Sequence, residues 1–153
     1  MKTASPSTEV DIDNASEAPV PDAEQFRLWV DAAVAGRRDA ALVSIRIVDE
    51  DEGRDLNVEW RGKDYSTNVL SFPANLPKHL GIPLLGDLIM CAPVVASEAA
   101  AQGKTETDHW AHMTIHGVLH LLGYDHEKPA EAERMEALER QILAGLGIAD
   151  PYL

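Results

Sequence analysis

The sequence predicts a single α+β domain in which a small mixed four-stranded sheet is packed by about five helices. Four short stretches alternate apolar and polar residues or run apolar as strands do, and five longer windows repeat apolar residues every three or four positions. Prolines and glycines separate these segments without an internal repeat or a convincing linker. A chain of 153 residues with 45% hydrophobic residues suits one core of this kind. We expect a flexible tail at 1–8 and one folded domain at 9–153.

The four expected strands are recognised from period-two alternation and from short apolar runs. Val10 and Ile12 alternate with acidic neighbours, which is typical of a half-buried strand. The run NVLSFP is stopped by Pro73, and the stretch ANLPKHLGIP after it is expected to be a loop because it holds two prolines and a glycine. The expected strands lie in 9–13, 41–48, 68–73 and 84–93.

Five helices are expected from apolar residues on one face and from the residues at their ends. Pro21 and Asp22 open the first helix, and Gly36 ends it. The helix over 107–122 is apolar on most sides, which indicates a buried helix. The last helix is expected to point many charges outward and to bury Met135, Leu138, Ile142 and Leu143. The expected helices cover about 22–36, 52–60, 94–103, 107–122 and 129–145.

The composition favours a cytoplasmic protein without membrane or DNA partners. The net charge is −13, from 13 basic and 26 acidic residues, which argues against general electrostatic attraction to nucleic acid or to an anionic membrane. Cys91 is the only cysteine, so no internal disulfide can form, as suits a reducing compartment. No apolar run approaches membrane-spanning length, and the N-terminus has no signal-peptide pattern.

The stretch 116–126, HGVLHLLGYDH, holds three histidines in a pattern that favours a metal site. His116 and His120 are four residues apart, so on a helix their imidazoles lie one turn apart on the same face. Gly123 stands where a helix C-terminus often needs a left-handed residue, and a turn there would bring His126 back towards the pair. Satisfied core histidines are the alternative, and three at this spacing make that alternative weak.

A site of three imidazoles favours one catalytic Zn²⁺ per chain. Three neutral nitrogen ligands leave the fourth tetrahedral position open, as in catalytic rather than structural zinc sites. Zinc in such a site lowers the pKa of its water to about 7. Nickel and copper also accept imidazole, but zinc is favoured in the absence of a thiolate ligand.

Six other polar residues each have more than one possible role. His112 lies one turn before the pair. Four roles are open for it: a further metal ligand, a partner that supports the ligands, a general base, or a core residue that only packs. Asp125 either orients an imidazole or caps the turn. Asp87, inside an apolar strand, either pairs with a histidine or Arg61 or closes a bulge after Gly86. Thr67, Asn68 and Ser71 either face the cleft with hydroxyl and amide groups or cap turns.

The HxxxHxxGxxH spacing is that of a zincin-like zinc-binding helix. In the metzincin peptidases a glutamate directly follows the first histidine and acts as general base. Here that position is Gly117, so peptide hydrolysis by that mechanism lacks its proton acceptor.

The stretch HGVLHLLGYDH resembles the signature of the YbeY family, the bacterial endoribonucleases of ribosomal RNA maturation. The resemblance covers about 41–153 well and 9–40 through secondary-structure pattern only. Many family members have aspartate where this chain has Asn68. Further blocks that match the family in order are LNVEWRGKDYSTNVLSFP at 56–73, LLGDLIM at 84–90, ERMEALERQIL at 133–143 and DPYL at the end.

The resemblance implies a metal-dependent endoribonuclease that cuts single-stranded RNA in 16S rRNA 3′-end maturation and in ribosome quality control. It implies Zn²⁺ held by His116, His120 and His126, with His116 and Arg61 as catalytic residues. A guanidinium suits this role because phosphodiester cleavage builds negative charge on phosphoryl oxygens. The alternative for Arg61 is a solvated turn.

The same resemblance implies rRNA, the small ribosomal subunit, and a ribosomal protein or an assembly GTPase as partners. The acidic net charge then requires either a local basic cleft around Arg61, Lys63 and Arg46 or delivery of the RNA by a partner. Two other functions remain open at this stage: a non-catalytic ribosome assembly factor with a structural zinc, and a zinc-dependent hydrolase or peptidase.

Overall fold

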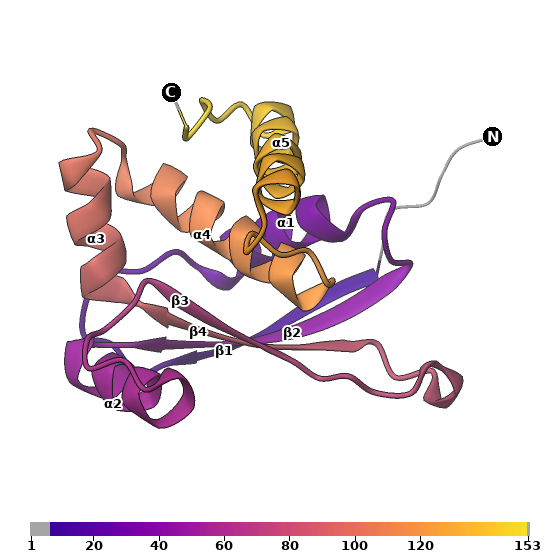
Figure 1. Ribbon diagram of the computed structural model, residues 1–153, viewed down its shortest axis with the longest axis horizontal. Helices are drawn as coiled ribbons and strands as arrows, with labels where there is room; N and C mark the ends of the chain where they lie inside the picture. The colour runs from indigo at the N-terminus through magenta and orange to yellow at the C-terminus, as the bar shows by residue number, and fades with distance from the viewer. Residues whose placement is uncertain (1–6, 153) are drawn as a thin grey trace.

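The computed structural model describes residues 7–152, and the side chain of residue 78 is outside the description. A four-stranded sheet and five α-helices account for most of this part of the chain (Figure 1), as the sequence predicts. No helix within residues 7–152 has the length and apolarity that a membrane crossing requires. In chain order the elements are β1 (Ser7–Asn14), α1 (Ala23–Val34), β2 (Ala40–Val48), α2 (Glu50–Arg61), β3 (Val69–Pro73), a 3₁₀ turn (Lys78–Leu80), β4 (Leu84–Cys91), α3 (Ala92–Ala101), α4 (Glu106–Leu121) and α5 (Pro129–Gly145).

The sheet is mixed, with strand order β1-β2-β4-β3. β1 is parallel to β2 and β2 to β4, whereas the edge strand β3 runs antiparallel to β4. The register between β2 and β4 shifts where Leu42 pairs with Leu84 and Val43 pairs with Gly86. Gly86 has φ +150°, and a Cβ there would lie 2.2 Å from the carbonyl oxygen of Phe72. Glycine therefore lets β3 approach β4 at this irregularity.

The two faces of the sheet have different cover. α1, α4 and α5 lie on one side and α2 on the other (Figure 1). Strand residues that point towards α1 and α4 are fully buried, among them Val43, Ile45 and Leu88. Phe26 packs edge-to-face against Trp29 and Trp110, which joins α1 to α4 in the core.

Most of the expected elements are present, with differences at their ends. β1 begins at Ser7, so residues 7 and 8 belong to the sheet and not to the expected tail; residues 1–6 lie outside the described residues. Residues 7 and 8 pair with Ala40 and Ala41 of β2, and the buried Thr8 hydroxyl donates to Asp31 at 2.7 Å. α2 is longer than expected and includes Gly53, where a Cβ would lie 2.3 Å from the Ser66 hydroxyl.

α5 departs from expectation at one position that matters for the site. Met135 and Leu143 are buried and Leu138 and Ile142 are partly buried, as expected. Many charges of this helix face outward, as expected, among them Glu133, Arg134 and Arg140. Glu139 does not, because it is only 1% exposed. Positions 135, 139 and 143 are four residues apart, so Glu139 lies on the buried stripe of the helix. This spacing was the available signal that the carboxylate is internal.

Candidate metal centre

Three histidines meet at the C-terminal end of α4. The helix carries His116 and His120 one turn apart, and the turn after Leu121 returns His126 to them. One ring nitrogen from each histidine lies within 4.8 Å of the other two, a group that can hold a metal ion. The ring centroids are separated by 4.8 Å, 4.9 Å and 5.4 Å. The spacing in the sequence therefore gave the convergence of the three rings correctly.

The turn that returns His126 is held by backbone hydrogen bonds. Gly123 has φ +104°, as the glycine position predicts, and the Tyr124 amide donates to the Leu119 carbonyl at 3.0 Å. Asp125 Oδ1 accepts from the backbone amide of His126 at 2.7 Å but lies 3.9 Å from its Nδ1. Of the two roles considered for Asp125, the structure shows the second: its side chain caps the turn.

A buried carboxylate on α5 supports the first histidine. Glu139 Oε2 lies 3.2 Å from His116 Nδ1, and Oε1 lies 2.5 Å from His112 Nε2 and 2.7 Å from the Tyr152 hydroxyl. Since an ionised carboxylate only accepts, all three partners must donate to it. His116 is therefore protonated on Nδ1, which leaves the lone pair of its Nε2 available for a metal ion.

The charges in this cluster suit a cation. Burial alone raises the pKa of Glu139, but hydrogen bonds from His112, His116 and Tyr152 outweigh it and lower the pKa to about 2. Burial, followed by the proximity of His116 and His126, lowers the pKa of His120 to about 4. A neutral imidazole at His120 and an ionised carboxylate behind His116 are the protonation states that a cation site requires.

His112 lies beside the three-histidine group rather than in it. Its ring is 6% exposed, with its centroid 6.4 Å from that of His116. Its Nε2 donates to Glu139 at 2.5 Å, so it shares an acceptor with His116. Of the roles considered for His112, the structure supports that of a partner behind a candidate metal ligand, because His112 helps to hold the carboxylate that accepts from His116. Sequence reasoning missed Glu139 and Tyr152, which complete this network.

Gly117 explains why no carboxylate follows the first histidine. It faces the sheet, and a Cβ there would lie 2.9 Å from Leu88 Cδ2 and 3.3 Å from Val69 Cγ2. Glycine allows α4 to pack closely against β4 and β3. A side chain at this position would press into the sheet instead of reaching the histidines, so the base of the metzincin peptidases has no place here.

The histidines open onto a cleft of about 840 Å³ that Arg61 also lines. Arg61 is the last residue of α2, and Gly62, with φ +68°, ends the helix beside it. Within residues 7–152 no carboxylate lies within 4.0 Å of the Arg61 guanidinium. The other lining residues are Trp60, Thr67, Asn68, Val69, Leu70, Ser71, Phe72, Pro73, Asp125 and Glu127.

Two polar residues that line the cleft, one in β3 and one in the loop before it, already form hydrogen bonds within the protein. The Ser71 hydroxyl donates to the Gly117 carbonyl at 3.2 Å. The Asn68 amide donates to Glu98 at 3.1 Å and its Oδ1 accepts from the Val69 amide at 2.7 Å. Both side chains thus tie β3 to the neighbouring helices while lining the cleft.

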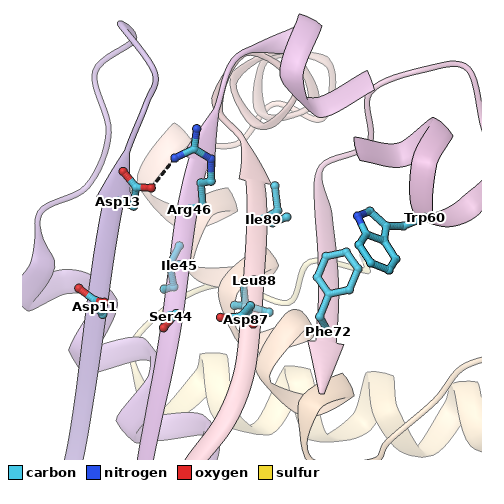
Figure 2. A pocket seen from close by; sticks show the side chains of 10 residues that line it. All are labelled: Asp11, Asp13, Ser44, Ile45, Arg46, Trp60, Phe72, Asp87, Leu88 and Ile89. Atoms are coloured by element: carbon cyan, nitrogen blue, oxygen red, sulfur yellow. Dashed lines mark hydrogen bonds and ion pairs between the residues drawn. The ribbon is translucent and has the colours of Figure 1, made fainter. Parts of the chain in front are cut away.

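Asp87 and Arg46 lie on the other face of the sheet (Figure 2), which excludes one of the alternatives considered for each residue. The remaining alternative for Asp87, a bulge after Gly86, fits the register shift at that glycine. Asp87 pairs in register with Ser44 and faces away from α4, because residues alternate between the two faces of a strand. It therefore reaches neither the histidines nor Arg61. Arg46 pairs with Asp13 and Glu52 and adds no positive charge to the metal cleft. Lys63 is exposed and lies outside the residues that line the cleft.

Comparison with known proteins identifies the family of this chain. The sequence model of the family described as "Endoribonuclease YbeY" matches residues 11–147. The chain belongs to the YbeY family. A protein of this family from Pseudomonas syringae, named Endoribonuclease YbeY, is 59% identical over 145 residues, which cover 94% of this chain and 87% of the relative. One from Xylella fastidiosa with the same name is 62% identical over 138 residues, 88% of this chain and 86% of the relative.

The family model matches from residue 11, so it also covers most of 9–40, where the resemblance rested on the pattern of secondary structure and not on sequence motifs. The solution structure of TM1509 from Thermotoga maritima has the same fold, with a TM-score of 0.59 and 23% identity over 90% of this chain and 91% of that protein. The α+β fold and the family expected from HGVLHLLGYDH are therefore confirmed.

Proposed function

We propose that this protein is a zinc-dependent endoribonuclease that cuts single-stranded RNA during maturation of the 16S rRNA 3′ end and in ribosome quality control, in the cytoplasm. One observation carries the proposal: three converging imidazoles and an unpaired arginine line the same cleft. Membership of a family whose relatives are named endoribonucleases supports the reaction class.

The donor set fits Zn²⁺. His116, His120 and His126 would hold one ion per chain through three neutral nitrogen atoms, and no thiolate is among the converging groups. The Glu139 carboxylate behind His116 would orient this ligand and add negative charge next to it. Bound zinc would supply Lewis acidity, which activates a water molecule and polarises a phosphoryl oxygen.

Arg61 would act on the phosphate itself. Its guanidinium is permanently charged and presents paired N–H donors that match two phosphoryl oxygens. Within residues 7–152 it has no carboxylate partner, so nothing competes with a phosphate for its donors. We assign Arg61 to orienting the phosphodiester and offsetting the charge that grows on it during cleavage.

The acidic charge of the chain supports a setting in which the RNA is presented by a partner. Asp125 and Glu127 are part of the cleft wall and repel phosphate. The net charge of −13 weakens attraction to free RNA further. We propose the small ribosomal subunit as this setting, with a ribosomal protein or an assembly GTPase in contact.

The test measures metal content and cleavage of a 16S rRNA 3′-end fragment for proteins purified in parallel. Wild type should hold one zinc and cut. Arg61→Ala should hold zinc and cut roughly 100-fold more slowly, by analogy with removal of a donor that stabilises transition-state charge. Arg54→Ala is the matched control, because Arg54 lies on the same helix, is exposed and lies 3.9 Å from Asp64.

Three outcomes would contradict the proposal. Equal cutting by wild type, Arg61→Ala and His120→Ala would identify the activity as a contaminant. A zinc-bound protein that cuts neither free RNA nor RNA in small ribosomal subunits would be a non-catalytic assembly factor. Cleavage of a protein substrate with RNA left intact would indicate a peptidase.

A further inference from the structure

The arginines of this chain divide into two groups by their partners. Four of the eight pair with carboxylates, and the other four have no carboxylate within 4.0 Å in residues 7–152. This is unexpected where acidic residues outnumber basic residues 26 to 13. The paired group is Arg27, Arg46, Arg54 and Arg140. The unpaired group is Arg61, already placed in the metal cleft, and Arg37, Arg38 and Arg134.

The three remaining arginines line one small cavity, which we call the arginine pocket. Arg37 and Arg38 come from the turn after α1, and Arg134 comes from α5, so the pocket joins segments almost 100 residues apart in the chain. The cavity measures about 260 Å³, and its wall is completed by 122–124 without any acidic residue. Asp39 and Glu133 are exposed sequence neighbours, but neither pairs with these guanidinium groups.

Backbone carbonyls hold two of the three guanidinium groups in place. Arg37 Nη1 donates to the carbonyls of Ala33 at 3.4 Å and Ala35 at 3.2 Å, while its buried Nε has no hydrogen-bond partner in the described chain. Arg38 Nη1 donates to the Arg37 carbonyl at 3.0 Å. In the part of the chain that the structure describes, the three charges line one cavity without a carboxylate partner, which is the condition for binding an anion from solution.

The arginine pocket adjoins the metal cleft through one turn. Leu122, Gly123 and Tyr124 line the pocket, and Asp125, His126 and Glu127 line the cleft. The same six-residue segment therefore separates the two cavities. A polymer of regularly spaced negative charges that leaves the cleft across this turn would meet the three arginines.

We propose that Arg37, Arg38 and Arg134 bind a backbone phosphate of the RNA substrate, away from the phosphodiester that is cut. This inference rests on the proposed function and adds a second contact for the same strand. The four unpaired arginines would then contact one RNA strand at two places, Arg61 in the metal cleft and the other three in the arginine pocket. Local positive sites of this kind let a strongly acidic protein hold RNA, since phosphate contacts supply much of the affinity.

The experiment measures binding of zinc-loaded full-length protein to fluorescent single-stranded RNAs of about 4 and about 16 nucleotides over a salt series, lengths that bracket common single-strand site sizes. The variant is Arg37→Gln/Arg38→Gln/Arg134→Gln. The control, Arg27→Gln/Arg54→Gln/Arg140→Gln, removes the same charge from α1, α2 and α5 at arginines that pair with carboxylates. Zinc content and thermal unfolding confirm that each protein is folded.

We expect the pocket variant to lose at least 10-fold in affinity for the long RNA, with a salt slope shallower by about 0.7 for each phosphate contact removed. Its binding and cutting of the short RNA should match wild type, whereas Arg61→Ala should impair both lengths. An equal loss in pocket variant and control, or a loss on the short RNA, would overturn the inference.

Two further results separate the inference from the proposed function. If wild type cuts RNA and the pocket variant retains its length dependence, the proposed function stands and the inference fails. If inorganic phosphate binds the pocket and longer RNA brings no gain in affinity, the pocket serves a small anion and the inference fails. If wild type neither binds nor cuts RNA, both fail.

Discussion

The two faces of the central sheet both carry charged residues, but they use them differently. On the α4 face, the Glu139 carboxylate is 1% exposed and accepts from His116, His112 and Tyr152. On the opposite face, a groove of about 520 Å³ holds Arg46, whose side chain is 37% exposed. Arg46 pairs with Asp13, as Figure 2 shows, and with Glu52. The carboxylate at the centre of the first set is buried, whereas all members of the second set are open to water.

This difference in exposure decides what each set of contacts can do. Inside the core a broken hydrogen bond leaves a donor without water or partner, so the geometry of the imidazoles is fixed. At the surface an ion pair is screened and its side chains can be solvated instead, so it contributes at most about 1 kcal/mol. The comparison indicates that the shape of the metal centre depends on the buried network and is insensitive to the exposed one.

The largest effect is expected from Glu139→Gln. If the NH₂ group takes the place of Oε2, the His116 N–H loses its acceptor; if it takes the place of Oε1, His112 and Tyr152 both lose theirs. Zinc affinity should fall roughly 10- to 100-fold, as for other groups that orient a metal ligand. Competition with a chromophoric chelator measures it, and the absorption spectrum of the cobalt-substituted protein reports the altered geometry.

The control for this variant is Glu136→Gln, one turn earlier on α5 and partly exposed. It should bind zinc as wild type does. Unchanged zinc affinity in Glu139→Gln would show that the buried carboxylate does not position His116, and the comparison between the two faces would lose its basis.

A smaller effect, on stability, is expected from Gly117→Ala. The added Cβ would lie 2.9 Å from Leu88 Cδ2, so either the buried Leu88 side chain or α4 must shift. Overpacking of this kind costs about 1–3 kcal/mol of unfolding free energy, which urea denaturation measures. Gly145→Ala is the matched helical control, because nothing lies within 4 Å of its Cβ position, and it should be neutral or stabilising. Equal stability of the two variants would contradict close packing at Gly117.

The smallest effect is expected from Arg46→Ala on the open face. The variant removes ion pairs with Asp13 and Glu52 in which all the side chains are at least 37% exposed. The unfolding free energy should fall by about 1 kcal/mol or less, with zinc affinity unchanged. Urea denaturation and chelator competition measure the two quantities. A loss of zinc affinity would mean that the two faces are coupled through the sheet.

The positions of the helices and strands could largely be predicted because their signals are local. The alternation of Val10 and Ile12 with polar residues predicts a strand. Asp22 caps α1 by accepting a hydrogen bond from the Gln25 amide. The ends of the elements also involve distant segments: β1 begins where Ser7 pairs with Ala40, and Thr8 donates to Asp31, 23 residues away. A window of sequence has no information on such a partner.

The sequence by itself determined the convergence of His116, His120 and His126, because helical periodicity and a left-handed glycine are properties of consecutive residues. Only the tertiary structure decided that Glu139 reaches His116 and that Asp87 faces away from the cleft. It alone brought Arg37 and Arg38 beside Arg134. The physical reason is that these contacts join segments distant in the chain, and burial and sheet register select them when the core forms.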